Sequence, residues 1–192
     1  MLSSAEFSDW CRRIGLPSEG RRLVEQIRES QPSRPVRSGT HNVSGRYPSN
    51  KMGVSIQFES RTVEGAAIQI MEHDDDVLEY YDQPLAFKLV YPDREGRRHG
   101  FLHTADFFVL RHDRAGYEEW KDENSLVKLA ERMPHRYVRG EGGRWSCPPT
   151  EAHTAKHGLY YALRTTAEIG PIYYRNLVFL GDYLLESVDD QE

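Results

Sequence analysis

The chain has 192 residues, of which 38% are hydrophobic and 29% are charged, and this composition and length fit one folded domain with a substantial core. No segment approaches the roughly twenty consecutive apolar residues that cross a membrane, and the N-terminus lacks a secretory signal pattern, so the sequence predicts a cytoplasmic protein. The two cysteines, Cys11 and Cys147, are far apart and have no metal-ligand spacing, which argues against a disulfide framework or a zinc site.

The net charge of −5 is divided unevenly along the chain. Residues 1–53 contain nine Lys and Arg against five Asp and Glu, a net charge of +4, which leaves −9 on residues 54–192. Two short helices are expected over residues 4–30, broken near Gly15, and residues 31–53 are rich in Pro, Ser, Gly and Arg. We therefore predict a basic helical and extended arm over residues 1–53 and a body over residues 54–192. An uneven but merely solvated surface is the alternative explanation of the charge pattern.

In the body, hydrophobic periodicity and turn residues predict alternating helices and strands. Helices are expected near residues 60–73, 124–133, 150–157 and 171–186. Strands are expected near residues 77–83, 85–91, 103–111, 117–121 and 159–164, with an irregular segment at residues 134–149. This order predicts an α/β fold with a mixed sheet.

A short pattern of charged residues lies on two neighbouring predicted strands. Asp106 stands between apolar residues in TADFFV, although a buried acid is rare without a partner. One hairpin later, Glu119 and Lys121 are two residues apart on a strand and therefore project from the same face. We expect the hairpin to bring them beside Asp106 as a D-x12-E-x-K motif. The structural alternative is an exposed cross-strand pair of Glu119 and Lys121.

These residue types match the chemistry of phosphodiester hydrolysis. Magnesium binds carboxylate oxygens, polarises a phosphoryl oxygen and lowers the pKa of a bound water. A nearby lysine can orient the attacking water or stabilise charge in the transition state. A further carboxylate is expected from the preceding helix, where Glu59 at the entrance and Glu64 one turn inside are both candidates.

Several longer segments resemble one known family. The resemblance is to the N-terminal catalytic domain of TnsA, the endonuclease subunit of heteromeric cut-and-paste transposases, and it rests on the segments GRYPSNKMGVSIQFESRTVE, HDDDVLEYYDQPLAFKLVY, HTADFFVLR and EEWK. The family's V-x-x-aromatic-x-x-Q-P stretch is similar to residues 77–84, and its T-x-D-F strand is similar to the segment around Asp106. The later segments LYYALRTTAEI and RNLVFLGDYL extend the resemblance, which covers residues 45–186.

The resemblance implies a restriction-endonuclease-like fold, in which a mixed central sheet is flanked by helices, and an active site of the PD-(D/E)xK type. The family's catalytic glutamate precedes the valine matched by Val77 by about thirteen residues, which selects Glu64 rather than Glu59. The implied catalytic residues are Glu64, Asp106, Glu119 and Lys121. The implied metal ligands are Glu64, Asp106, Glu119 and the backbone carbonyl of Trp120. The implied cofactor is Mg²⁺, with Mn²⁺ as a substitute.

The resemblance also implies a function and partners. The chain is expected to be a metal-dependent DNA endonuclease that cuts the 5′ (non-transferred) strand of double-stranded DNA at transposon ends. A DDE-type transposase subunit is the expected partner. Longer members of the family have a further C-terminal domain that binds a transposition ATPase, which is therefore a second candidate partner. Candidates for phosphate contacts are Arg34, Arg37, Arg46 and Lys51. Two alternatives stay open: an autonomous restriction or repair nuclease of the same fold, and a non-catalytic DNA-binding assembly module.

Two other features have simpler explanations. The acidic run Asp74-Asp75-Asp76 lacks the spacing of a calcium-binding loop and is expected to be a solvated helix end. His103, at the edge of a predicted strand, is expected to hydrogen-bond the backbone; the alternative is that it reaches the site.

Overall fold

The computed structural model describes residues 1–33, 44–92 and 95–186, so the expected phosphate contacts Arg34 and Arg37 lie outside the described residues. The helices are α1 (Ser4–Arg13), α2 (Ser18–Glu29), α3 (Glu64–His73), α4 (Glu123–Arg132), α5 (Pro148–Ala155) and α6 (Pro171–Glu186). The strands are β1 (Gly45–Ser49), β2 (Val54–Phe58), β3 (Val77–Asp82), β4 (Phe87–Pro92), β5 (Arg98–His103), β6 (Phe107–Arg111), β7 (Ala115–Lys121), β8 (Val138–Arg139), β9 (Trp145–Ser146) and β10 (Tyr160–Thr165). None of the described helices is long and apolar enough to cross a membrane.

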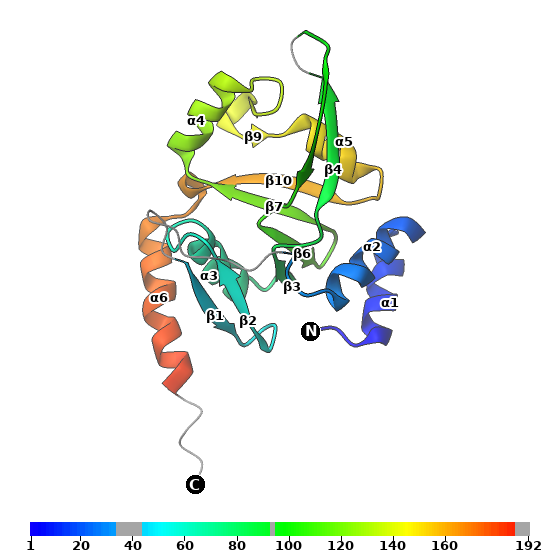
Figure 1. Cartoon of the computed structure of the whole chain (residues 1–192). Helices are drawn as coiled ribbons and strands as arrows, with labels where there is room; N and C mark the ends of the chain where they lie inside the picture. Colours follow the sequence, from blue (N-terminus) through cyan, green and yellow to red (C-terminus); the bar gives the residue numbers. More distant parts are fainter. Residues whose placement is uncertain (34–43, 93–94, 187–192) are drawn as a thin grey trace.

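Four strands form the central sheet, in the order β10-β7-β6-β3 (Figure 1). Strand β10 runs parallel to β7, whereas β6 is antiparallel to both β7 and β3. A parallel pair needs a long crossover, and here the crossover contains α4 and α5. The architecture is therefore α/β with a mixed central sheet flanked by helices, as the sequence predicts.

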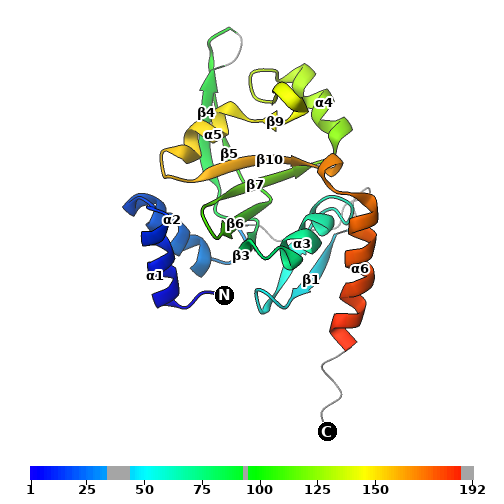
Figure 2. The ribbon, with the colours of Figure 1, turned by 180° about the vertical axis from the view of Figure 1, so that it is seen from behind.

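Strand β6 is buried on both faces, and its alternating side chains enter two different cores. Phe107 and Val109 pack on the face covered by α3 and the β1–β2 hairpin. Phe108 and Leu110 pack on the opposite face, in the cluster that contains Trp10 of α1. Figure 2 shows α3 and the β1–β2 hairpin beside α6, away from α1 and α2. A strand covered on both faces carries a continuous apolar run, which explains the sequence FFVL.

The first two helices are part of this packing and do not form a separate arm. Phe7 and Trp10 of α1 and Ile27 of α2 are buried in the same core cluster as the sheet. The expected boundary between residues 53 and 54 falls where the turn of the β1–β2 hairpin meets β2. The chain therefore does not divide there, because amphipathic helices bury their apolar face against the sheet wherever they stand in the sequence.

The strand expected over residues 103–111 is in fact two strands. Strand β5 ends at His103 and pairs with β4 in a two-stranded ribbon, whereas β6 begins at Phe107 in the central sheet. The chain passes from one sheet to the other through Thr104, Ala105 and Asp106. The break is only three residues long and has apolar residues on both sides, and the sequence pattern did not reveal it.

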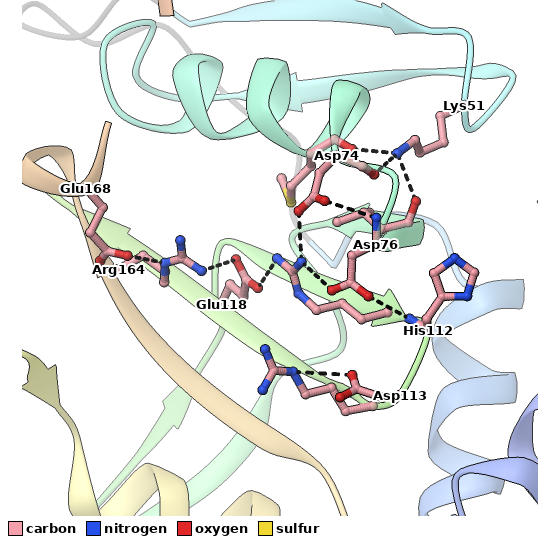
Figure 3. Close-up of polar contacts among 12 residues, drawn as sticks. Lys51, Asp74, Asp76, His112, Asp113, Glu118, Arg164 and Glu168 are labelled. Carbon is pink, nitrogen blue, oxygen red and sulfur yellow. Dashed lines mark hydrogen bonds and ion pairs between the residues drawn. The ribbon is translucent and has the colours of Figure 1, made fainter. Parts of the chain in front are cut away.

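Lys51 lies in the turn of the β1–β2 hairpin and anchors the C-terminal end of α3. Its Nζ donates to the carbonyl oxygens of Met71 at 2.8 Å, Asp74 at 2.6 Å and Val77 at 2.8 Å (Figure 3). An ammonium has three protons, and a cation is favourable where helix carbonyls lack partners. The expectation that Lys51 binds DNA phosphate is therefore corrected: its three donors serve the fold.

The acidic run after α3 is tied to the sheet and is more than a solvated helix end. Arg111 Nη1 is 3.0 Å from Asp74 Oδ2 and 3.1 Å from Asp76 Oδ2, and its Nη2 is 3.0 Å from Glu118 Oε1 (Figure 3). Glu118 is 1% exposed, so its charge requires a partner of this kind. Arg111 thus joins the end of α3 to β6 and β7.

Lys51→Met should lower the free energy of unfolding by about 2 kcal/mol, because the carbonyls at the end of α3 lose their donor while the apolar stem is kept. Urea unfolding measures the change. Arg46→Met is the matched control, since it removes an exposed charge from the same hairpin and should leave the midpoint unchanged. Equal midpoints for the two variants would contradict the anchoring role of Lys51.

Candidate active site

Asp106 stands immediately before β6, at the point where the chain enters the central sheet. Its Oδ2 accepts a hydrogen bond of 2.7 Å from the Trp120 backbone N–H, and its carbonyl oxygen accepts one of 2.9 Å from the Gln83 N–H. Gln83 itself has a left-handed φ of 45°. Asp106 is therefore held between the ends of β3 and β7, not in the middle of a strand as the sequence suggested.

Glu119 and Lys121 lie beside Asp106 on β7. The register pairs Phe107 with Glu118, which places Asp106, one residue earlier, next to Glu119. Lys121 Nζ is 2.5 Å from Glu119 Oε1. Glu119 is 5% exposed, so the alternative of a solvated surface pair does not hold.

Glu64 is the first residue of α3 and is largely buried. Its Oε2 accepts a hydrogen bond of 2.8 Å from the backbone N–H of Glu59. The two glutamates that the sequence left open are thus close together, but they differ in role: Glu64 supplies a buried carboxylate, and Glu59 supplies the N–H that orients it. The negative charge of Glu64 contributes to the raised pKa of Asp106.

The electrostatics of the group centre on Asp106. Burial raises the pKa of Asp106 to about 8, and the charges of Glu119 and Glu64 add to the increase. Burial also raises the pKa of Glu119, but the Lys121 and His103 charges outweigh it and the net pKa is lowered. Burial lowers the pKa of Lys121, yet Glu119 and Asp106 raise it above its usual value overall. The neighbouring negative charges therefore raise the pKa of Asp106, while Glu119 and Lys121 form a charged pair.

Residues 74–165 match the family model described as the TnsA-like endonuclease N-terminal domain. The chain carries a TnsA-like endonuclease domain. Asp106, Glu119 and Lys121 lie within the matched segment, whereas Glu64 lies ten residues before it. No curated protein gives a significant match to the chain. The mixed sheet and its flanking helices are compatible with the restriction-endonuclease-like fold, and the match supports a nuclease function.

The TnsA-like domain has the donor types that a hard divalent cation prefers. Asp106 and Glu119 offer carboxylate oxygens, with Glu64 nearby. The N–H and C=O of one strand residue point to the same edge, so the Trp120 carbonyl faces the edge to which its N–H donates. A cation here would offset the charge that raises the pKa of Asp106. The donor set therefore fits Mg²⁺ or Mn²⁺ in chemistry.

The donors are not converged for a metal as they stand. Among the described residues, no group of three or more His, Cys, Asp or Glu side chains is arranged to hold an ion. Three contacts hold the carboxylates in other directions: the Glu119 carboxylate is turned toward Lys121 and Tyr161, and the Glu64 carboxylate is held by the Glu59 N–H.

Two further residues lie beside Glu119: Tyr161, which was not predicted from the sequence, and His103, for which a place at the site was the less favoured alternative. The Tyr161 hydroxyl donates to Glu119 Oε2, and His103 Nε2 lies 3.5 Å from the same oxygen. His103 is buried, which lowers its pKa, and it contacts this carboxylate and not the strand backbone expected for it. Tyr161 comes from β10, which pairs with β7 in parallel and sets Leu163 opposite Glu119. Only that register reveals the contact, because the two residues are 42 positions apart.

Asp106→Asn should stabilise the metal-free domain increasingly as the pH rises from about 4 to 8. In this window the folded protein keeps a proton on Asp106 that the unfolded chain has lost, so wild-type stability falls with increasing pH. Asparagine does not titrate and its amide oxygen still accepts the Trp120 N–H. Melting temperatures in EDTA at pH 5, 6.5 and 8 measure the difference.

The exposed Asp113 provides the control for this series, since its side chain is 76% exposed beside Arg114. Asp113→Asn should follow the wild-type melting temperature at every pH. A constant difference between Asp106→Asn and the wild type across the series would show that Asp106 is not crowded in the folded state.

Proposed function

We propose that the chain is a metal-dependent DNA endonuclease of the TnsA type that cuts the 5′ (non-transferred) strand of double-stranded DNA at transposon ends. The observation that carries the proposal is the gathering of the Glu64, Glu119 and Lys121 charges around Asp106. Three of these four residues lie in the segment that matches the TnsA-like endonuclease domain. Crowded carboxylates of this kind are expensive for a fold and are typical of functional sites.

Each side chain of the group has a task in this proposal. Bound Mg²⁺, held by Asp106, Glu119, Glu64 and the Trp120 carbonyl, would polarise the scissile phosphate and lower the pKa of a bound water; Mn²⁺ is expected to substitute. Lys121 keeps its charge because Glu119 and Asp106 raise its pKa. It can therefore bind a phosphate oxygen and stabilise charge that develops there in the transition state.

The surrounding residues hold this group in place. The Glu59 N–H fixes the Glu64 carboxylate at the start of α3, and the Trp120 N–H fixes Asp106. Tyr161 and His103 contact Glu119 Oε2 and position this carboxylate, whose other oxygen faces Lys121. Orientation by fixed donors reduces the reorganisation that the reaction requires.

Two alternatives differ from the proposal in measurable ways. An autonomous restriction or repair nuclease would use the same side chains but would cleave duplex DNA without a partner. A non-catalytic DNA-binding module has no use for a lysine paired with a buried carboxylate beside an acid whose pKa is raised to about 8. This costly arrangement favours an enzyme over the binding module.

Lys121→Ala should abolish DNA cleavage while leaving metal and DNA binding nearly unchanged, because its role lies in the transition state. Asp106→Ala should abolish both cleavage and the increase in melting temperature that Mg²⁺ or Mn²⁺ produces by mass action. Nicking of a labelled duplex and thermal unfolding with increasing metal concentration measure the two effects.

The two glutamates provide an internal comparison in the same assay. Glu64→Ala should reduce cleavage at least 100-fold, as removal of a catalytic group commonly does. Glu59→Ala should have a small effect, since its contribution to Glu64 is a backbone N–H that alanine keeps. The reverse order would move the helix carboxylate to Glu59 and contradict the assignment.

The isolated chain should bind duplex DNA weakly and cleave it little with Mg²⁺, and a DDE-type transposase bound at transposon ends should restore cleavage. The overall charge of −5 disfavours independent DNA binding. Arg34, Arg37 and Arg46 stay candidates for phosphate contacts, and Arg46 is exposed on β1. A transposition ATPase is a further proposed partner. Rapid, specific cleavage of naked duplex by the purified chain would instead establish the autonomous nuclease.

A further inference from the structure

A two-stranded ribbon stands apart from the central sheet. Strands β4 and β5 pair antiparallel from Phe87–His103 at the base to Pro92–Arg98 near the tip. Both views show the ribbon projecting from the body beside α5 (Figures 1 and 2). Its base is at the candidate active site, since His103 Nε2 is 3.5 Å from Glu119 Oε2.

One face of the ribbon is anchored by aromatic contacts. The Phe87 ring stacks on His153 of α5 with centroids 4.7 Å apart and meets the edge of Tyr117 at 5.2 Å. Farther along, the Arg136 guanidinium lies 4.6 Å from the centre of the Phe101 ring. These contacts fix the direction in which the ribbon projects, and they leave its other face outward.

The outward face combines basic and apolar side chains. Lys88 lies opposite Leu102 on this face, Val90 follows two residues farther along, and Arg98 lies near the tip beside Arg97. Leu102 is 75% exposed and Val90 is 47% exposed, which is unusual for apolar residues on an unsupported ribbon.

The charge of the ribbon is opposite to that of the rest of the chain. Residues 87–103 contain four Lys and Arg against two Asp and Glu, a net charge of +2. Since the whole chain has −5, the remaining residues carry −7. A second copy docked on the same face would bring two positive segments together, whereas a polyanion matches the charge.

We propose that the outward face of the β4–β5 ribbon binds a groove of duplex DNA and aligns the duplex with the active site. A two-stranded ribbon fits the major groove, where basic side chains reach phosphates and base edges and apolar side chains contact thymine methyl groups. The proposal rests on the proposed nuclease function, because the bound duplex is the substrate.

The length of the ribbon sets where it touches the duplex. Arg98 is five residues from His103, a span of roughly 17 Å at about 3.4 Å per strand residue. At about 3.4 Å per base pair this corresponds to roughly five base pairs, half a turn of the duplex from the scissile phosphate. A ribbon that runs along the duplex axis would therefore place its tip about half a turn from the cut.

The test measures binding without cleavage. Fluorescence anisotropy with a 30-base-pair duplex in EDTA, over a range of KCl concentrations, gives the salt dependence of the association constant. The triple variant Lys88→Ala, Arg97→Ala, Arg98→Ala should lower the slope of log K against log salt by about 2 to 3, at about 0.9 for each lost phosphate contact. The control Arg12→Ala, Arg13→Ala, Arg22→Ala removes the same charge from exposed positions on α1 and α2 and should keep the slope.

A photoreactive label attached to the thiol of the Arg98→Cys variant locates the contact independently. Crosslinks to the DNA are expected about five base pairs from the cleaved bond. Equal losses of slope in the two triple variants, or an effect of the ribbon variant on self-association in sedimentation velocity and not on DNA binding, would overturn the proposal. If the ribbon variant cleaves DNA and its salt slope is unchanged, the DNA-binding role of the ribbon is wrong and the nuclease function stands. If DNA binding depends on the ribbon but the wild-type chain cleaves DNA under no condition, the nuclease function is wrong and the DNA-binding role of the ribbon stands.

Discussion

The hydrogen bond from the Trp120 N–H to Asp106 Oδ2 brings the candidate site together. It fastens the entrance of β6 to the end of β7, and β7 carries Glu119 and Lys121 on the face that this entrance approaches. Because Asp106 lies where the chain passes from the ribbon to the central sheet, the same bond also fixes the base of the ribbon. The candidate site, the entrance of β6 and the end of β7 therefore meet at Asp106.

Strand β7 carries two adjacent buried glutamates with contrasting surroundings. Glu118 faces Arg111, whose guanidinium also binds Asp74 and Asp76, and this cluster joins α3 to the sheet (Figure 3). Glu119 faces the opposite side and has Lys121 as its charged partner. The first pair is compensated by a permanently charged arginine and serves stability. The second lies beside Asp106, whose pKa is raised to about 8 by burial and by the charges of Glu119 and Glu64, and this suits a site that gains a cation.

Each face of the central sheet supports a different part of the candidate site or of the ribbon. The α3 face supplies the Glu64 carboxylate and is held in place by Lys51, whose ammonium binds three carbonyls at the end of α3. The other face is covered by α1, α2 and α5, and α5 supports the ribbon through His153 and Phe87. Packing that stabilises each face thus also positions an element of the proposed DNA-binding surface.

The sequence by itself determined the residue types of the site and the order of most elements. Period-two spacing placed Glu119 and Lys121 on one face, and the resemblance favoured Glu64 over Glu59. Tertiary structure decided which groups these residues meet: Tyr161 reaches Glu119 through a parallel register, and Lys51 donates its three protons to carbonyl oxygens at and after the end of α3. Periodicity records which face of an element is buried, but it carries no information on the neighbour that buries it. The assembly of the strands fixes the hydrogen bond between Tyr161 and Glu119, which are 42 residues apart. It also fixes the break between β5 and β6.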